Sequence, residues 1–261
     1  MLDALSPQRR RVVLAGVAVV ALLLAVLVGG LVVRAGRPVA AVPQDVLGPV
    51  LLVPGYGGDG SSLQPLAAAV RAAGRNAVVV PEVGDGTGDL DAQAAALARV
   101  AEQARDEAGA PSVDVVGYSA GGVVARLWVR DHGGDAVARR VLTLGSPHHG
   151  TTQAALGASL AGGCPTACEQ LVPGSALLRR LNARDETPAG PGWVTLRSTA
   201  DQVVTPVDSA ALDGALDVVV QDLCPAARTP HGGLPTDPVT LALLGSALGA
   251  GDPAAPADVR C

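Results

Sequence analysis

One serine of the chain stands in a setting that suits a nucleophile. It is the centre of Gly117-Tyr118-Ser119-Ala120-Gly121, which lies between a valine-rich segment and a segment with helical character. The glycines at the two ends allow a sharp strand-to-helix turn, which would lift the hydroxyl above the edge of a sheet. The pattern predicts that Ser119 attacks a carbonyl carbon. The alternative is that Ser119 only caps the helix.

A serine hydroxyl needs a base that takes its proton, and the base needs a carboxylate that fixes its tautomer. His231 is the candidate base, because it follows the last predicted strand and precedes the last predicted helix. Otherwise it would be a histidine of a surface loop. Asp201 is the candidate acid, because it comes directly after a predicted strand. The other candidates for the acid are Asp208, Asp213 and Asp222.

The oxyanion of a tetrahedral intermediate needs two fixed N–H donors. We expect one from the residue after the nucleophile and one from the loop after the first core strand. These are the backbone amides of Ala120 and Tyr56. Gly55 and Gly57 would let a carbonyl group come close to this loop. A glycine-rich turn that donates nothing is the alternative.

The other histidines are not assigned to the chemistry. His148 and His149 are adjacent and could ligate a metal, but no carboxylate or cysteine spacing nearby completes a tetrahedral set. We therefore expect no metal and no cofactor. His132 lies near the end of the helix that follows Ser119, and we expect it to be exposed to solvent.

Strand and helix patterns alternate along the chain. Short runs rich in Val and Leu predict strands, and segments with apolar residues three and four positions apart predict helices. The predicted strands end near residues 53, 80, 116, 144, 199 and 220, and residues 151–190 form an irregular excursion. This alternation predicts an α/β fold with a mostly parallel central sheet flanked by helices.

These motifs resemble those of the extracellular lipases and esterases of the α/β-hydrolase superfamily, in particular the small bacterial triacylglycerol lipases. The resemblance covers roughly residues 47–248. It lies in five segments, which are Val53–Gly57, Val116–Gly122, Gly145–Thr151, Asp201–Pro206 and His231–Leu234. It implies the α/β-hydrolase fold and an acyl ester, most often of a lipid, as substrate. The order Ser119, Asp201, His231 is the one expected of that superfamily.

Two positions depart from the pattern of these enzymes. They often have a histidine before the glycine of the oxyanion loop and another before the nucleophile, where this chain has Pro54 and Tyr118. Neither position supplies the catalytic proton. The mechanism is therefore expected to be unchanged, while the preferred acyl chain is left open.

Two other functions fit the same residues. An acyltransferase acting on envelope lipids would use the same triad and replace water by another acceptor. A catalytically inactive binding module on the cell surface would keep the fold alone. The presence of Ser119, Asp201 and His231 together argues against the inactive module. Ester hydrolysis, in which the histidine activates first the serine and then water, is the leading hypothesis, and analysis of the products with an added alcohol would separate it from acyl transfer.

The N-terminal segment predicts export of the catalytic domain. Residues 1–11 end in three arginines, and an uncharged apolar run follows over residues 12–33. As a helix this run would be about 33 Å long, enough to cross a bilayer. The arginines favour a cytoplasmic N-terminus, so the linker 34–46 and the catalytic domain 47–261 would lie outside the cytoplasm. A cleaved signal peptide, and hence secretion, is the alternative.

Charge and cysteine content restrict the partners and the compartment. The formal net charge is −5 and no basic run lies outside the N-terminus, which excludes the electrostatic footprint of a nucleic-acid-binding protein. We expect a monomer. All four cysteines follow the apolar segment, as disulfides of an oxidising compartment would, although reduced buried thiols are the alternative. Cys164 and Cys168 are close together in the sequence, whereas Cys224 follows the last predicted strand and Cys261 ends the chain. These positions predict the pairs Cys164–Cys168 and Cys224–Cys261.

Overall fold

The structure is a computed structural model that describes residues 8, 14, 16, 18–22, 24, 42–58 and 60–261. Residue contacts divide the chain into two units, Met1–Val39 and Ala40–Cys261. The described residues of the first unit are helical. No helix among all these described residues has both the length and the apolar character that a membrane crossing requires. The predicted segments 1–11 and 12–33 lie largely outside the described residues.

The second unit is built on a sheet of parallel strands in the order β2-β1-β3-β4-β5-β6. The strands are β1 (Val50–Val53), β2 (Ala77–Val79), β3 (Val113–Tyr118), β4 (Ala138–Leu144), β5 (Gly192–Arg197) and β6 (Leu216–Val219). The predicted α/β fold with a mostly parallel sheet is confirmed.

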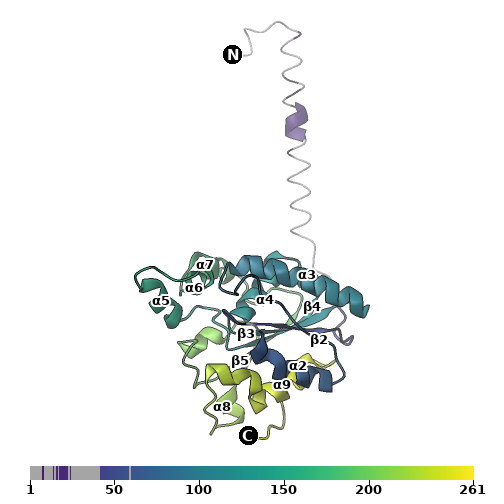
Figure 1. The fold of residues 1–261 in the computed structure, drawn as a ribbon. Coiled ribbons are helices and arrows are strands. Elements are labelled where there is room, and N and C mark those ends of the chain that lie inside the picture. Colours follow the sequence, from purple (N-terminus) through teal and green to yellow (C-terminus); the bar gives the residue numbers. More distant parts are fainter. Residues whose placement is uncertain are drawn as a thin grey trace. The chain divides into compact units, whose positions relative to one another are not determined.

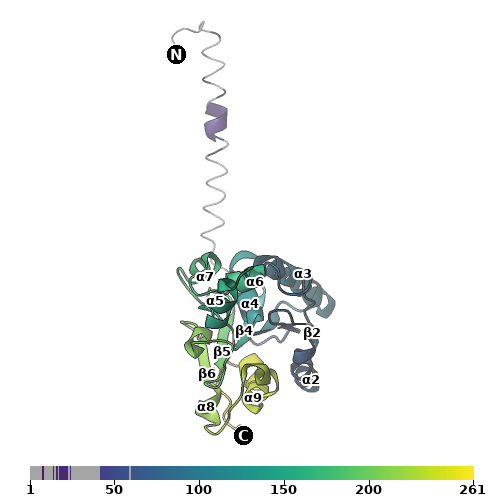
Figure 2. The same ribbon diagram turned by 60° about the vertical axis from the view of Figure 1, so that its left-hand side comes forward.

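Helices cover both faces of this sheet (Figures 1 and 2). On one face lie α3 (Leu90–Ala108) and α4 (Ala120–Asp131), and on the other lie α2 (Gln64–Ala72) and α9 (Pro238–Leu248). Side chains of a strand alternate between the two faces. Leu51 of β1 therefore packs in the α3/α4 layer and Leu52 in the α2/α9 layer, both fully buried. Burial on both faces explains why the strands read as continuous apolar runs.

The remaining helices are short. Residues 151–190, predicted as irregular, contain α5 (Thr152–Ser159), α6 (Thr166–Gln170) and α7 (Ala176–Leu181), which pack in succession near α3 (Figure 1). The residue predicted to end the last strand instead begins α8 (Val220–Leu223). The 3₁₀ helices are η2 (Ser61–Leu63), η3 (Gly134–Ala136), η4 (Val207–Ala210) and η5 (His231–Thr236).

A buried ionic cluster holds the sheet and the last helix together. The Asp114 carboxylate on β3 is fully buried and accepts hydrogen bonds from Arg75 at 2.6 Å and from Arg139 at 2.5 Å. Both arginines also donate to the carbonyl oxygen of Leu248, at the C-terminal end of α9. Positive charges at the C-terminal end of a helix interact favourably with the helix dipole. The arginines also neutralise the negative charge of the buried carboxylate. The cluster thus fixes α9 against the sheet.

Part of the segment predicted as a linker is packed against the domain. Val42 is buried, with 8% of its surface exposed. The Gln44 carbonyl accepts a hydrogen bond from Arg139 at 3.0 Å, and its side chain accepts one from Arg140. The second unit accordingly includes residues before the predicted boundary at 47.

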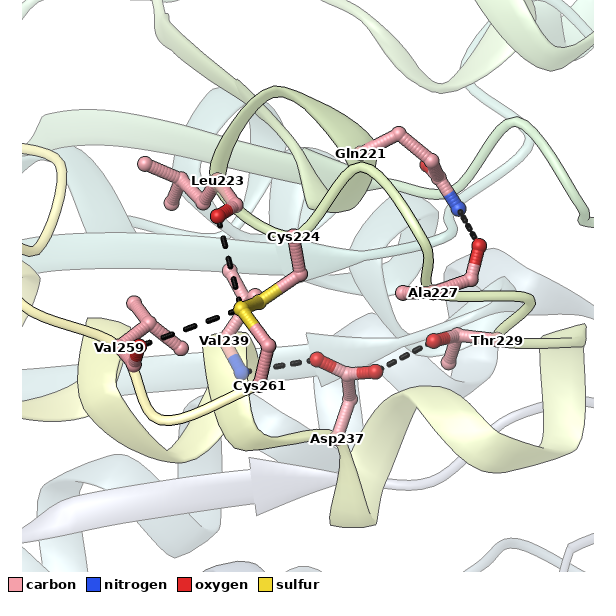
Figure 3. Close-up of a disulfide and its surroundings, with 9 residues drawn as sticks. All are labelled: Gln221, Leu223, Cys224, Ala227, Thr229, Asp237, Val239, Val259 and Cys261. Atoms are coloured by element: carbon pink, nitrogen blue, oxygen red, sulfur yellow. Dashed lines mark hydrogen bonds between the residues drawn. A yellow bond between two sulfur atoms is a disulfide. The ribbon is translucent and has the colours of Figure 1, made fainter.

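Two disulfides join the cysteines in the pairs Cys164–Cys168 and Cys224–Cys261. The second links the turn after α8 to the last residue of the chain (Figure 3). Beside it, Asp237 caps α9 by accepting a hydrogen bond from the Val239 amide at 2.8 Å. The C-terminal tail is therefore held on the domain next to the start of α9.

The long-range disulfide should dominate the stability that the cysteines contribute. Replacing Cys224 and Cys261 by serine opens a loop with a sequence separation of 37, and on the chain-entropy model this costs roughly 3–4 kcal/mol of unfolding free energy. Urea denaturation measures this loss. The matched control replaces Cys164 and Cys168, which lie 4 positions apart, by serine. A larger loss in this control would contradict the prediction.

Candidate active site

Three of the residues singled out in the sequence meet at one edge of the sheet. The strands are parallel, so their carboxyl ends lie at the same edge. Ser119 follows β3 directly, Asp201 follows β5, and His231 begins η5 after β6 and α8. The topology therefore places a hydroxyl, a carboxylate and an imidazole close together from distant parts of the chain.

The backbone at Ser119 is strained. Its φ of 54° and ψ of −126° are rarely adopted by a non-glycine residue, and Ser119 alone among the described non-glycine residues has a positive φ. Glycines make this turn fit. A Cβ added to Gly117 would lie 2.6 Å from the Gly122 Cα, and one added to Gly121 would lie 2.3 Å from the Val53 carbonyl oxygen. The turn thus presses α4 closely onto β1 and β3.

Ser119, His231 and Asp201 form a chain of hydrogen bonds. The His231 Nε2 lies 3.0 Å from the Ser119 Oγ, and its Nδ1 lies 2.7 Å from the Asp201 Oδ2. An ionised carboxylate only accepts, so Nδ1 carries the proton and Nε2 is free to accept the serine proton. The geometry allows the serine hydroxyl to be deprotonated by the imidazole.

The Asp201 carboxylate is buried but remains ionised. Burial alone would raise its pKa, but the hydrogen bond and the charge of His231 and the amides of Val204 and Val203 lower the pKa below the usual 3.8. The amides of Val203 and Val204 donate to Oδ1 at 2.8 and 3.0 Å. This leaves Oδ2 for the imidazole. The negative charge can stabilise an imidazolium when His231 takes up a proton.

The other candidate acids lie away from His231. Asp208 is exposed and forms an ion pair with Arg197 at 2.7 Å. Asp213 and Asp222 are also exposed. Of the four aspartates considered, only Asp201 hydrogen-bonds to the imidazole in the described part of the chain.

Tyr118 supports His231, a role that was not predicted from the sequence. The two rings lie 5.2 Å apart between centroids, and the Tyr118 hydroxyl donates a hydrogen bond to the His231 carbonyl oxygen at 3.3 Å. Burial, and next the negative charge of Asp201, raises the pKa of Tyr118 to about 12. The hydroxyl therefore stays protonated and can donate. The sequence offered one sign of this role, because one of the 2 tyrosines of the chain stands directly before the nucleophile.

Gly145, at the end of β4, leaves room for this arrangement. Its φ is 53°, and a Cβ at this position would lie 2.5 Å from the Leu234 Cδ1 and 3.1 Å from the Asp201 Oδ2. A side chain would therefore displace the residues that surround the imidazole. Gly145 belongs to one of the five segments of the resemblance, but this role could not be predicted for it.

The loop before His231 is held at two points. The Thr229 carbonyl oxygen accepts a hydrogen bond from the Ser198 hydroxyl at 2.7 Å. The Thr229 hydroxyl in turn donates to Asp237, the residue that caps α9 (Figure 3). The start of η5 is thereby fixed between β5 and α9, which restricts the position of the imidazole.

A cavity of about 230 Å³ opens beside Ser119. Its other lining residues are Tyr56, Pro147, Thr151, Gln153, Ala154, Cys168, Leu171, Val203 and Val204. The wall is mainly apolar, with α5 and α6 supplying much of one side. The predicted oxyanion loop is adjacent, since a Cβ on Gly55 would lie 2.9 Å from the Ser119 Cβ. Donation by the amides of Tyr56 and Ala120 stays a prediction.

The adjacent histidines face separate partners. His148 is fully buried, with Nε2 lying 3.1 Å from the Thr143 hydroxyl oxygen. Burial, followed by the positive charges of Arg126 and His149, lowers its pKa well below the usual 6.5. The His149 Nε2 instead lies 2.8 Å from Glu186. Within the described residues, no group of three or more His, Cys, Asp or Glu side chains is arranged to hold a metal ion.

His132 does not take part in this site. It is the C-cap of α4, and its Nε2 lies 3.1 Å from the Asp91 Oδ1. Its side chain is 22% exposed. His132, expected to be exposed to solvent, is therefore partly exposed, because the first turn of α3 covers part of the ring.

Comparison with known proteins identifies the family. A family model described as palmitoyl protein thioesterase matches residues 49–183. The chain belongs to the palmitoyl protein thioesterase family. The matched segment contains Tyr56, Ser119 and Ala120, whereas Asp201 and His231 lie beyond it. No curated protein matches the chain.

Solved structures share the fold of this family member. Lipase B of Aspergillus fumigatus has a TM-score of 0.70 at 20% identity, covering 81% of this chain and 54% of that one. The mature lipase BlEst2 of Bacillus licheniformis has a TM-score of 0.64 at 20% identity, covering 82% and 96%. The metagenomic carboxyl esterase MGS0156 has a TM-score of 0.51 at 17% identity, covering 70% and 65%. The chain thus has the α/β-hydrolase fold and spans about half the length of the Aspergillus lipase.

Tyr118→Phe should reduce hydrolysis of p-nitrophenyl butyrate by about fivefold, because one hydrogen bond to the His231 backbone is lost while the ring contact remains. Tyr118→Ala should cost more, since the packing against the imidazole is lost as well. Steady-state kinetics measures both variants. Wild-type kcat/KM in Tyr118→Ala would show that the tyrosine does not support the imidazole.

Proposed function

We propose that this member of the family is a serine hydrolase that cleaves acyl esters or thioesters through an acyl-enzyme on Ser119. The observation that carries the proposal is the hydrogen-bonded chain from Ser119 through His231 to Asp201, with distances of 3.0 and 2.7 Å, beside an apolar cavity. The family name supports a fatty acyl group on a thiol. The fold shared with lipases and a carboxyl esterase supports acyl esters.

Acylation follows from the order of the three groups. His231 Nε2 takes the proton of Ser119 as Oγ bonds to the carbonyl carbon of the substrate. The oxygen becomes an oxyanion, which the amides of Tyr56 and Ala120 stabilise. The imidazolium, held by Asp201, then gives its proton to the leaving alcohol or thiol as the carbonyl–heteroatom bond breaks.

Deacylation repeats these steps with water. His231 takes a proton from the water molecule as its oxygen bonds to the acyl carbon. The second oxyanion collapses, the bond to Ser119 Oγ breaks, and the imidazolium returns its proton to the serine. The products are a free acid and the regenerated enzyme, so neither a metal nor a cofactor is needed.

The cavity is the site for the acyl portion of the substrate. Ala154, Leu171 and Val204 are buried and line it next to the nucleophile. Each methylene removed from water contributes about 0.8 kcal/mol to binding. A volume of about 230 Å³ is smaller than the roughly 300–1,000 Å³ of sites for drug-sized ligands. A short or medium acyl group would therefore be enclosed, while a longer chain would extend past the mouth.

We also propose that the catalytic domain lies outside the cytoplasm. The disulfides Cys164–Cys168 and Cys224–Cys261 support an oxidising compartment. Residues 12–33 would act as a single membrane anchor, or the segment would be cleaved and the domain secreted. The enzyme would act as a monomer on acyl esters of lipid type.

Ser119→Ala should lower ester hydrolysis by several orders of magnitude, because the nucleophile is lost while the fold is kept. Asp201→Asn should lower kcat by about 10⁴-fold, because the amide favours the wrong imidazole tautomer. Kinetics with p-nitrophenyl butyrate measures both, and circular dichroism checks folding. Asp208→Asn is the matched control and should have nearly wild-type activity. The proposal fails if folded Ser119→Ala retains more than about a tenth of the activity.

The acyl-chain preference should follow the size of the residues in the cavity wall. Leu171→Ala enlarges the cavity and should move the optimum of a p-nitrophenyl ester series towards longer chains. Ala154→Leu fills it and should move the optimum towards acetate. Leu160→Ala is the control, since Leu160 is 61% exposed and does not line the cavity. An unchanged chain-length profile in both wall variants would place the acyl group elsewhere.

A further inference from the structure

Thr151 lies between the first turn of α5 and the loop that carries the acid. Its hydroxyl donates a hydrogen bond to the Val203 carbonyl oxygen and accepts one from the Thr205 amide at 3.4 Å. The same oxygen accepts from the Gln153 amide at 3.3 Å and so caps α5. The residue is buried, with 6% of its surface exposed. One hydroxyl thus contacts both the helix and the loop.

The next two residues strengthen this connection. The Thr152 amide donates to the Thr205 carbonyl oxygen at 2.9 Å. The Gln153 side chain donates to the Gln202 carbonyl oxygen at 2.6 Å. Residues 151–153 therefore hydrogen-bond to the loop 202–205 at successive positions, and only Thr151 does so from a buried side chain.

The held loop is the one that orients the Asp201 carboxylate. The amides of Val203 and Val204 donate to Oδ1 of Asp201, and this leaves Oδ2 at 2.7 Å from His231 Nδ1. A shift of the Val203 peptide would therefore rotate the carboxylate relative to the imidazole. The Thr151 hydroxyl restrains this peptide group through its hydrogen bond to the Val203 carbonyl oxygen.

Thr151 itself lines the cavity, and its backbone contacts another part of the cavity wall. Its amide donates to the Leu171 carbonyl oxygen at 3.0 Å. Leu171, Val203 and Val204 all line the cavity. The residue thus joins Leu171, the C-cap of α6, to the loop 202–205, and both are parts of the cavity wall.

We propose that Thr151 is a positioning residue, which orients Asp201 by holding the loop 202–205 and acts on catalysis through Asp201 and His231. The inference rests on the proposed function, because it assigns the effect of Thr151 to the triad. Loss of the hydroxyl leaves the Val203 carbonyl without this donor and the Thr205 amide without this acceptor. The carboxylate then loses its fixed orientation, while Ser119 and the other cavity side chains remain in place.

Thr151→Val removes the hydroxyl and keeps the branched shape, and Thr151→Ser keeps the hydroxyl. In the full chain, purified in detergent, Thr151→Val should lower kcat for p-nitrophenyl butyrate by about tenfold, with KM changed less than about twofold. Thr151→Ser should stay within about twofold of the wild type. Thr166→Val, at an exposed threonine of α6, is the matched control for the substitution itself and should have wild-type kinetics.

A double-mutant cycle separates positioning from a general structural effect. If Thr151 acts through Asp201, adding Thr151→Val to Asp201→Asn should change kcat little further. An equal tenfold loss in both backgrounds would overturn the inference, and so would a Thr151→Ser variant as impaired as Thr151→Val. Wild-type kcat in folded Thr151→Val would overturn it as well.

A spectroscopic measurement tests the inference without turnover. The His231 Nδ1 proton, hydrogen-bonded to Asp201, should give a low-field proton resonance that weakens or shifts in Thr151→Val and is retained in Thr151→Ser. If the valine variant does not fold, Thr151→Ala takes its place. Loss of activity in Ser119→Ala establishes the proposed function independently. An unchanged resonance alongside activity that depends on Ser119 would reject the role of Thr151 alone.

Discussion

The architecture depends on the tight turn at Ser119. Its backbone lies in a region that costs roughly 1–3 kcal/mol for a residue with a side chain, and its φ of 54° is maintained by the packing around it. Gly117 and Gly121 let α4 approach the backbone of β3 and β1, and Gly122 leaves room for the Ser146 side chain. Gly55 lets the loop after β1 reach Ser119. The strain is maintained because the elements on both sides are buried. The result is a hydroxyl presented at the edge where all the strands end.

Different interactions hold the two edges of the sheet. At the edge away from Ser119, Asp114 and its arginines connect the strands to the end of α9. At the edge of the site, uncharged hydrogen bonds fix the loops, among them that of Thr229 for the base and that of Thr151 for the acid. The buried ionic cluster supplies rigidity where no chemistry occurs. The site then needs only short connections to orient its groups.

The sheet and the order of the functional residues along the chain could be predicted from the sequence, because both leave strong local patterns. Val-rich runs and a glycine-flanked serine are visible without a structure, and Asp201 and His231 each follow a predicted strand or its connection. The helices α5, α6 and α7 were missed because they have few turns and depend on tertiary packing. The support from Tyr118 and the contacts of Gln44 could not be predicted, since they join residues far apart in the chain. The partial covering of His132 depends likewise on a distant helix, since its ring contacts Asp91 of α3.

The central claim is that Ser119 is a nucleophile activated by His231. The most direct measurement is reaction of the folded protein with a fluorophosphonate, followed by peptide mapping by mass spectrometry. A single phosphonyl adduct on Ser119 is predicted, with a rate that falls by orders of magnitude in His231→Ala. An adduct at another residue, a folded protein that does not react, or an equal rate in His231→Ala would contradict it.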